Sequence, residues 1–145
     1  MRALCLAVAL AALPLPVFAD GLVRIDLTLS PRAMAELAGQ AEMMTVSAFF
    51  WGEPAPGATI EPDGMGQIFL GAEDHIIWPL PQQVALGANF GTMPRAEVVA
   101  PMLNVNVFSA RFANEDNLLD CGLVDGAVAD LADTVQTVHC KLIGE

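Results

Sequence analysis

Strict alternation of apolar and polar residues is the feature that most limits how this chain can fold. Residues 23–29 (VRIDLTL) carry an apolar side chain at every odd position and a polar one at every even position. A side-chain period of two is typical of a strand that buries one face and exposes the other. The alternation recurs in residues 42–51, where the second face is only partly apolar, and from residue 103 to about 112. The chain is therefore predicted to be mainly β-structured.

Short β-rich segments separated by Gly, Pro and acidic residues supply the remaining expected strands. They cover residues 67–70, 75–80, 84–86, 118–122 and 135–143, and residues 125–133 are expected to form a helical turn or a loop. Breaker residues between positions 52 and 66 predict one long loop after the second strand. Seven or eight short strands with few helical signals predict an antiparallel β-sandwich, with an open barrel as the alternative.

One short helix is expected directly after the first strand. Ser30 can cap a helix N-terminus, and Pro31 suits the first helical position because a backbone N–H is not needed there. Apolar residues at positions 34, 37 and 38 follow at helical spacing before Gly39, where the helix is expected to end. This pattern predicts a helix that packs one face against a sheet.

The first 19 residues have the pattern of a secretory signal peptide. Arg2 precedes an apolar run from position 3 to 15, and Val17 and Ala19 are small residues at the two positions that a signal peptidase reads. The run is shorter than the roughly 18 apolar residues that a membrane span needs. Cleavage after Ala19 would leave residues 20–145 as one domain without a membrane anchor, in the periplasm or secreted.

Two cysteines remain after removal of the leader, which contains Cys5. An even number of cysteines in an exported chain predicts a disulfide, here between Cys121 and Cys140. Both fall on predicted strands, and their separation is unlike the Cys-x-x-Cys spacing of redox-active pairs. A structural role is therefore expected for this bond.

Charge and motifs exclude several classes of function. The chain carries 17 acidic residues against 6 Lys and Arg, with a net charge of -11, so it has no basic surface for nucleic acid. No nucleophile elbow, zinc-protease motif, phosphate-binding loop or Ser-x-x-Lys motif is present, and tyrosine is absent. A noncatalytic protein without a cofactor is expected, and its acidity favours a basic protein as partner.

Two other function classes remain as alternatives. A hydrolase could use paired carboxylates from Glu61, Asp63, Glu73 and Asp74. A metal-binding accessory protein could bind calcium through the oxygen-rich residues 114–117 and Asp120, or copper through His75, His139 and the six methionines after the leader. Neither set has the spacing of a known motif.

Two tryptophans and an acidic loop are the candidate binding residues. Trp51 lies with Phe49 on the less apolar face of the second predicted strand, and Trp78 lies in a segment bounded by Gly and Pro. The long loop contributes the three carboxylates of Glu53, Glu61 and Asp63. If the rings are exposed, they form a docking surface for a protein or a small ligand. The alternative is that they close the ends of the core.

The leader generates a direct prediction. Residues 1–19 should be absent from the exported protein, because they have no polar face with which to join a water-soluble fold. Intact-mass measurement of exported material should give the mass of residues 20–145. Recovery of protein that still carries Met1 or Arg2 would contradict the assignment.

Overall fold

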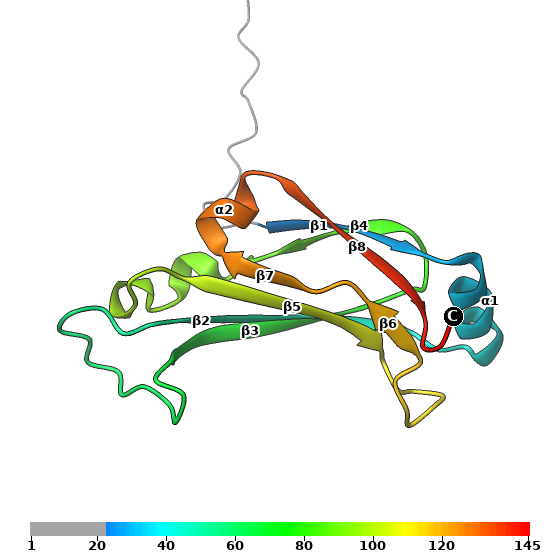
Figure 1. Cartoon of the computed structure of the whole chain (residues 1–145), viewed down its shortest axis with the longest axis horizontal. Coiled ribbons are helices and arrows are strands. Elements are labelled where there is room, and N and C mark those ends of the chain that lie inside the picture. Colours follow the sequence, from blue (N-terminus) through cyan, green and yellow to red (C-terminus); the bar gives the residue numbers. More distant parts are fainter. Residues whose placement is uncertain (1–22) are drawn as a thin grey trace, which may run out of the picture.

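The computed structural model describes residues 23–145, and the predicted leader lies outside this range. Two four-stranded sheets stack face to face, so the predicted β-sandwich is confirmed (Figure 1). One sheet has the strand order β4-β1-β8-β6 and the other the order β3-β2-β5-β7. The strands are β1 (Val23–Leu29), β2 (Met44–Gly52), β3 (Ile68–Ile77), β4 (Gln82–Leu86), β5 (Met102–Ser109), β6 (Leu119–Cys121), β7 (Val124–Ala127) and β8 (Val135–Leu142).

The alternating residues meet between the two sheets in one apolar core. From β1, Val23, Ile25 and Leu27 are almost completely buried, and Phe50 of β2 is the largest fully buried side chain. All strand pairs are antiparallel except β1 with β8, which run in parallel. Residues near the beginning of the described chain therefore pair with residues near its end.

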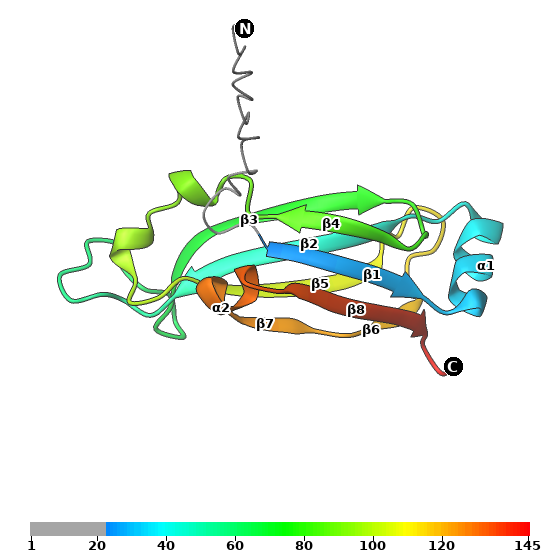
Figure 2. The same ribbon diagram turned by 90° about the horizontal axis from the view of Figure 1, so that it is seen from above.

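The predicted helix is α1 (Pro31–Gln40), at one end of the sandwich (Figure 2). The Ser30 hydroxyl oxygen accepts a hydrogen bond from the Ala33 backbone N–H at 3.0 Å, as expected of an N-cap. The helix continues past Gly39 and ends at Ala41, whose φ of 55° is left-handed. Shorter helices are η1 (Phe90–Thr92), η2 (Arg95–Glu97) and α2 (Val128–Ala132). No helix in residues 23–145 is long and apolar enough to cross a membrane.

The predicted pair of short strands at 67–70 and 75–80 is wrong. The structure has one continuous ten-residue strand, β3, and all of its residues except Leu70 pair with β2. Gly71, Glu73 and Asp74 resemble turn residues in sequence, but β3 is the edge strand of its sheet and can carry charged side chains there. A register shift in β2 between Phe50 and Trp51 accommodates the irregular pairing.

The segment 125–133 was expected to be a helical turn or a loop, but it begins with the end of a strand and continues as a short helix. Its beginning pairs with β5 as β7, and the single-turn helix α2 follows directly. The strand is only four residues long and includes Gly126. Its formation depends on pairing with β5, which local composition does not encode.

The predicted disulfide is confirmed. Cys121 of β6 lies opposite Cys140 of β8 in the antiparallel register, and the two Cα atoms are 4.1 Å apart. Cys140 is fully buried. The bond therefore fastens the short edge strand β6 to the core of its sheet.

Reduction of this disulfide should lower the free energy of unfolding by about 3 kcal/mol, because the unfolded chain regains the freedom of the closed loop. Urea unfolding with and without reductant measures the difference. A Cys121→Ala, Cys140→Ala double variant is the control, and its unfolding midpoint should not respond to reductant. A change below about 1 kcal/mol in the wild-type chain would contradict the stabilising role.

Candidate functional site

The outer face of the β3-β2-β5-β7 sheet differs from the rest of the surface, and we name it the aromatic face. Its side chains follow from the register, because residues opposite one another across paired strands share a face. Four rows cross it. The rows are Phe69–Trp51–Met102–Ala127, Ala72–Phe49–Asn104–Asp125, Asp74–Ser47–Asn106 and Ile76–Thr45–Phe108.

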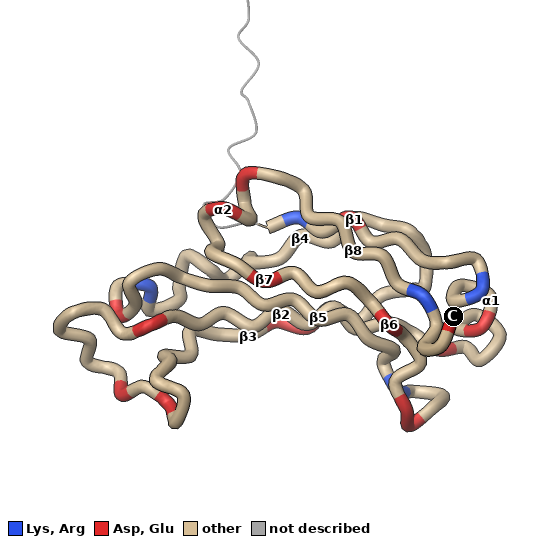
Figure 3. Tube along the Cα trace, in the orientation of Figure 1, with Lys and Arg blue, Asp and Glu red and all other residues tan. Residues whose placement is uncertain are grey.

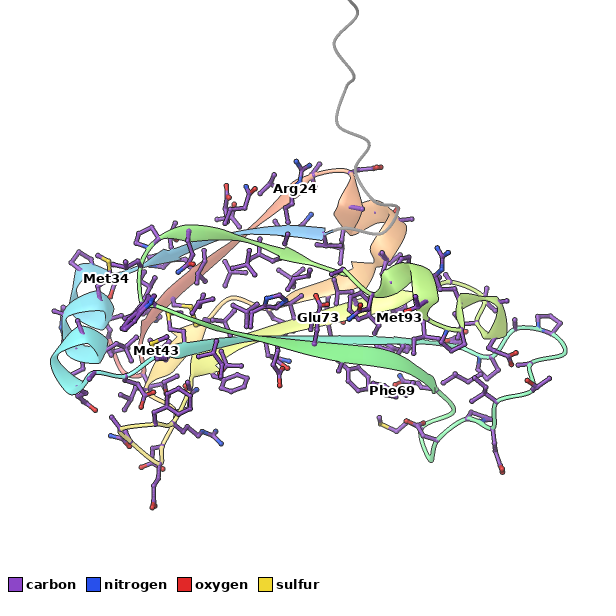
Figure 4. The ribbon with its side chains drawn as sticks, turned by 180° about the vertical axis from the view of Figure 1, so that it is seen from behind. Arg24, Met34, Met43, Phe69, Glu73 and Met93 are labelled. Atoms are coloured by element: carbon purple, nitrogen blue, oxygen red, sulfur yellow. A yellow bond between two sulfur atoms is a disulfide. The ribbon has the colours of Figure 1, made fainter. Side chains whose placement is uncertain are left out.

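Aromatic rings gather at one end of this face. The ring centroids of Phe49 and Phe69 are 5.1 Å apart and tilted by 35°. Phe49 is 42% exposed and Phe69 54% exposed, although both sit on strands of an ordered sheet. Trp51 is half-buried beside them and lines a cavity of about 170 Å³ together with Glu53 and Met102. Figure 4 shows Phe69 projecting from β3 away from the core, whereas Glu73 and Met93 lie between the sheets.

Polar acceptors occupy the middle of the face. The Asn106 side-chain amide donates to Asn104 Oδ1 at 2.6 Å, and the Asn104 amide donates to Asp125 Oδ1 at 3.2 Å. Asp74 lies on the opposite edge of the sheet, in the row of Asn106. We name Asp74, Asn104, Asn106 and Asp125 the acceptor band.

Two loops project beyond the aromatic face, one at each end (Figure 1). The first loop, residues 53–67, connects β2 to β3, and the second loop, residues 110–118, connects β5 to β6. Both loops carry acidic positions (Figure 3). The face is therefore the floor of a surface bounded at both ends by acidic loops.

Glu97 fixes the first loop. Its carboxylate accepts the backbone N–H groups of Thr59 and Ile60 and the Thr59 hydroxyl. The pKa of Glu97 is lowered by these bonds, that from Ile60 first. The neighbouring Val98 packs over Gly52, where an added Cβ would lie 2.6 Å from the Val98 Cβ. Only glycine allows this close approach at the base of the loop.

Glu42 fixes the second loop. Its buried carboxylate accepts four backbone N–H bonds, from Met43 at 3.0 Å, Phe112 at 3.1 Å, Ala113 at 2.8 Å and Asn114 at 3.1 Å. Burial raises the pKa of this carboxyl, but the four N–H donors together lower it further, so the net shift is downward. The second loop is thus held by a buried carboxylate whose charge is stabilised by backbone N–H donors, three of them from the loop itself.

The outer face of the other sheet has a different character. Lys141 forms an ion pair with Asp120 at 3.4 Å, and His139 contacts the Thr28 hydroxyl at 2.9 Å. Its strands carry positions of both charges (Figure 3), namely Arg24, Asp26, Asp120 and Lys141, and also polar residues such as Thr28 and Thr137. Its strands contain no Phe, Trp or Tyr, so the two outer faces do not offer equivalent surfaces.

Four of the five predicted binding residues belong to the end of β2 or to the first loop. Trp51 and Glu53 line the same small cavity, and Glu61 and Asp63 belong to the first loop. One oxygen of Asp63 is occupied by the backbone N–H groups of Met65 and Gln67, which shape the tip of this loop. These four residues lie at the aromatic end of the face.

Trp78 lies elsewhere. It follows the far end of β3, roughly 30 Å from Phe69 at about 3.3 Å per strand residue, and is 66% exposed. There it borders an apolar groove of about 540 Å³ beside α1, with Met34, Ala38 and Leu80 among its other walls. The two tryptophans therefore do not share one surface.

The carboxylates proposed for a hydrolase do not converge. Glu73 points between the sheets, where it accepts the Gly87 backbone N–H at 2.6 Å and contacts His75 at 3.4 Å. Asp74, the next residue, points to the aromatic face. Glu61 and Asp63 belong to the loop beyond the other end of β3. No acid and base pair faces a common space among these four residues.

The residues proposed for metal binding either lie in different sheets or already accept hydrogen bonds from the backbone. His75 lies on β3, whereas His139 lies on β8 in the other sheet. Asn117 Oδ1, proposed for calcium, accepts the backbone N–H groups of Ser109 and Leu119. Within residues 23–145, no group of three or more His, Cys, Asp or Glu side chains is arranged to hold an ion.

Comparison with known proteins finds no matching family model, no matching curated protein and no matching solved structure. The functional interpretation therefore depends on the geometry of the aromatic face.

Several residues of this face were not among the predicted site residues. Phe69 lay inside the predicted strand 67–70, but that strand was expected to be separate and short, and Asp125 lay in a segment without a predicted strand. The alternation from residue 103 had already placed Asn104 and Asn106 on the polar side of their strand. The sequence did not indicate that residues 68–77 form one strand paired with β2, or that residues 124–127 pair with β5.

Replacement of Glu42 by glutamine should cost about 1–3 kcal/mol of folding stability at pH 7, because buried N–H donors lose their charged acceptor. The folded pKa lies below the ordinary value of 4.5, so the carboxylate stabilises the fold above that pH and loses its effect as pH falls through the folded pKa. Urea unfolding from pH 7 to 3 should show this loss in the wild type and a weaker one in Glu42→Gln.

The matched control is Glu36→Gln, on the exposed side of α1, which should change stability by less than about 0.5 kcal/mol. Equal stability of Glu42→Gln and the wild type at pH 7 would show that Glu42 does not anchor the second loop.

Proposed function

We propose that this chain is an exported, noncatalytic binding domain whose docking surface is the aromatic face, and that its partner is a protein. The observation that carries the proposal is the exposed Phe49–Phe69 pair on a rigid sheet between two anchored loops. Large aromatic rings that are held on ordered strands lose little conformational entropy on binding, and such residues dominate binding energy at protein interfaces.

The openness of the surface favours a protein over a small ligand. Small-molecule sites are concave and usually enclose about 300–1,000 Å³. The cavity that adjoins the aromatic face has about 170 Å³, and the face itself is a sheet surface. Four strands about 4.8 Å apart and about 3.3 Å per residue along β2 give an area on the order of 500 Å². Together with the loops, this approaches the roughly 800 Å² per partner of a standard protein interface.

The Cys121–Cys140 bond supports a location in the periplasm or outside the cell, because structural disulfides form and persist in oxidising compartments. An exported protein that only binds a partner requires that partner in the same compartment. A protein without its own chemistry acts where its partner is found, and the predicted leader would deliver it to that compartment.

Photo-cross-linking in the cells that export the protein tests this proposal. Benzoylphenylalanine at position 69 should give a discrete protein adduct, whereas the same group in place of Thr137, an exposed position on the other sheet, should not. Phe49→Ala should remove the adduct, because loss of a hot-spot ring costs about 2 kcal/mol or more, roughly 30-fold in affinity. Phe49 points outward, so its replacement should leave the unfolding midpoint almost unchanged.

An adduct from position 137 alone, or an adduct at position 69 that survives Phe49→Ala, would refute the aromatic face as the docking surface. Absence of an adduct at both positions under conditions of full export would refute it as well.

A further inference from the structure

We infer that the segment that docks on the aromatic face is cationic and presents arginine or lysine side chains to the acceptor band. This inference rests on the proposed function, in which the aromatic face is the docking surface. It adds the chemistry of the partner, which follows from the hydrogen-bonding capacity and the charge of the face.

The open hydrogen-bonding groups of the acceptor band are mainly acceptors. Asn106 and Asn104 each donate one amide N–H within the band, toward Asn104 and Asp125 respectively. Within residues 23–145, no group donates to Asn106 Oδ1 or to the Asp74 carboxylate. Carboxylate and amide oxygens with open lone pairs are satisfied by donors, and guanidinium and ammonium groups have donors without acceptors.

The surface around the acceptor band is also mainly negatively charged. The outward positions of its four strands include Asp74 and Asp125 but no Lys or Arg. The first loop adds Glu53, Glu61 and Asp63, and the second loop adds Glu115 and Asp116. Arg111, over the Phe108 ring at 5.9 Å, is the one Lys or Arg in these strands and loops. Charge complementarity therefore selects a positively charged partner.

The spacing of the carboxylates sets the size of the docking segment. Asp74 and Asp125 lie on opposite edge strands, three strand spacings of about 4.8 Å apart and in adjacent rows, so their separation is roughly 15 Å. In an extended peptide, residues four apart lie about 13 Å from each other. Two basic residues at this spacing reach both carboxylates, and an apolar residue between them lies over the sheet near Phe49.

The probe is a nine-residue peptide with two arginines four positions apart and a leucine between them. Two matched peptides replace both arginines by citrulline, which keeps the shape but not the charge, or by glutamate. Titration into the ¹⁵N-labelled exported protein, followed by amide chemical shifts, reports both the affinity and the location of binding. A neutral glucose hexasaccharide is titrated in parallel.

The arginine peptide should perturb amides of β2 and β5 and bind at least 10-fold more tightly than the citrulline and glutamate peptides. An Asp74→Asn, Asp125→Asn variant should lose about 10-fold in affinity for the arginine peptide and keep its affinity for the citrulline peptide. Binding by the wild type should weaken with added salt more than binding by this variant. Asp26→Asn, Asp130→Asn, with the same change in net charge but away from the face, should retain wild-type affinity within 2-fold.

The outcomes separate this inference from the proposed function. Equal binding of the arginine and citrulline peptides at the aromatic face, or insensitivity to Asp74 and Asp125, would overturn the cationic partner and leave the docking surface intact. Perturbation of this face by the hexasaccharide alone would replace the protein partner by a carbohydrate. Perturbation of the other sheet only, or of no amides by any probe, would overturn both.

Discussion

The register of β2 is the constraint on which the rest of the structure depends. Its even-numbered residues are buried between the sheets, and Phe50 is the largest of them. Because successive strand side chains point to opposite faces, burial of this set forces Phe49 and Trp51 outward. A shift of one residue would bury these two rings and expose Met44, Val46, Ala48 and Phe50 instead. The exposed aromatic rings are therefore a direct result of optimal core packing.

The sequence predicts those elements of the fold that are determined by consecutive residues, and it does not predict those that depend on distant strands. The β1 pattern, the Ser30 cap and the outward positions of β2 are written in consecutive residues, and the structure agrees with them. The disulfide was predictable because only Cys121 and Cys140 remain when the predicted leader with Cys5 is set aside. The path of β3 through Gly71 to Asp74 and the existence of β7 depend on pairing with neighbours. For that reason the sequence did not predict which residues make up the aromatic face.

The two loop anchors show a second limit of sequence reasoning. Glu97 contacts residues 37 and 38 positions away, and Glu42 contacts residues 70 to 72 positions away. Acidic residues are mostly solvated, so nothing in the sequence marks either glutamate as a buried or loop-anchoring carboxylate. In the structure these carboxylates replace water with backbone N–H groups. Loops held in this way lose less entropy when a partner binds between them.

The parallel pairing of β1 with β8 also determines when the chain can fold. β1 lies between β4 and β8, and Thr28 contacts His139 across 111 residues of sequence. One sheet therefore lacks a central strand until the last residues of the chain are available. Strand pairing between such distant segments is slow, because the loop entropy is lost before the contact is gained. Cys140 belongs to the same late strand, so the native disulfide also forms late.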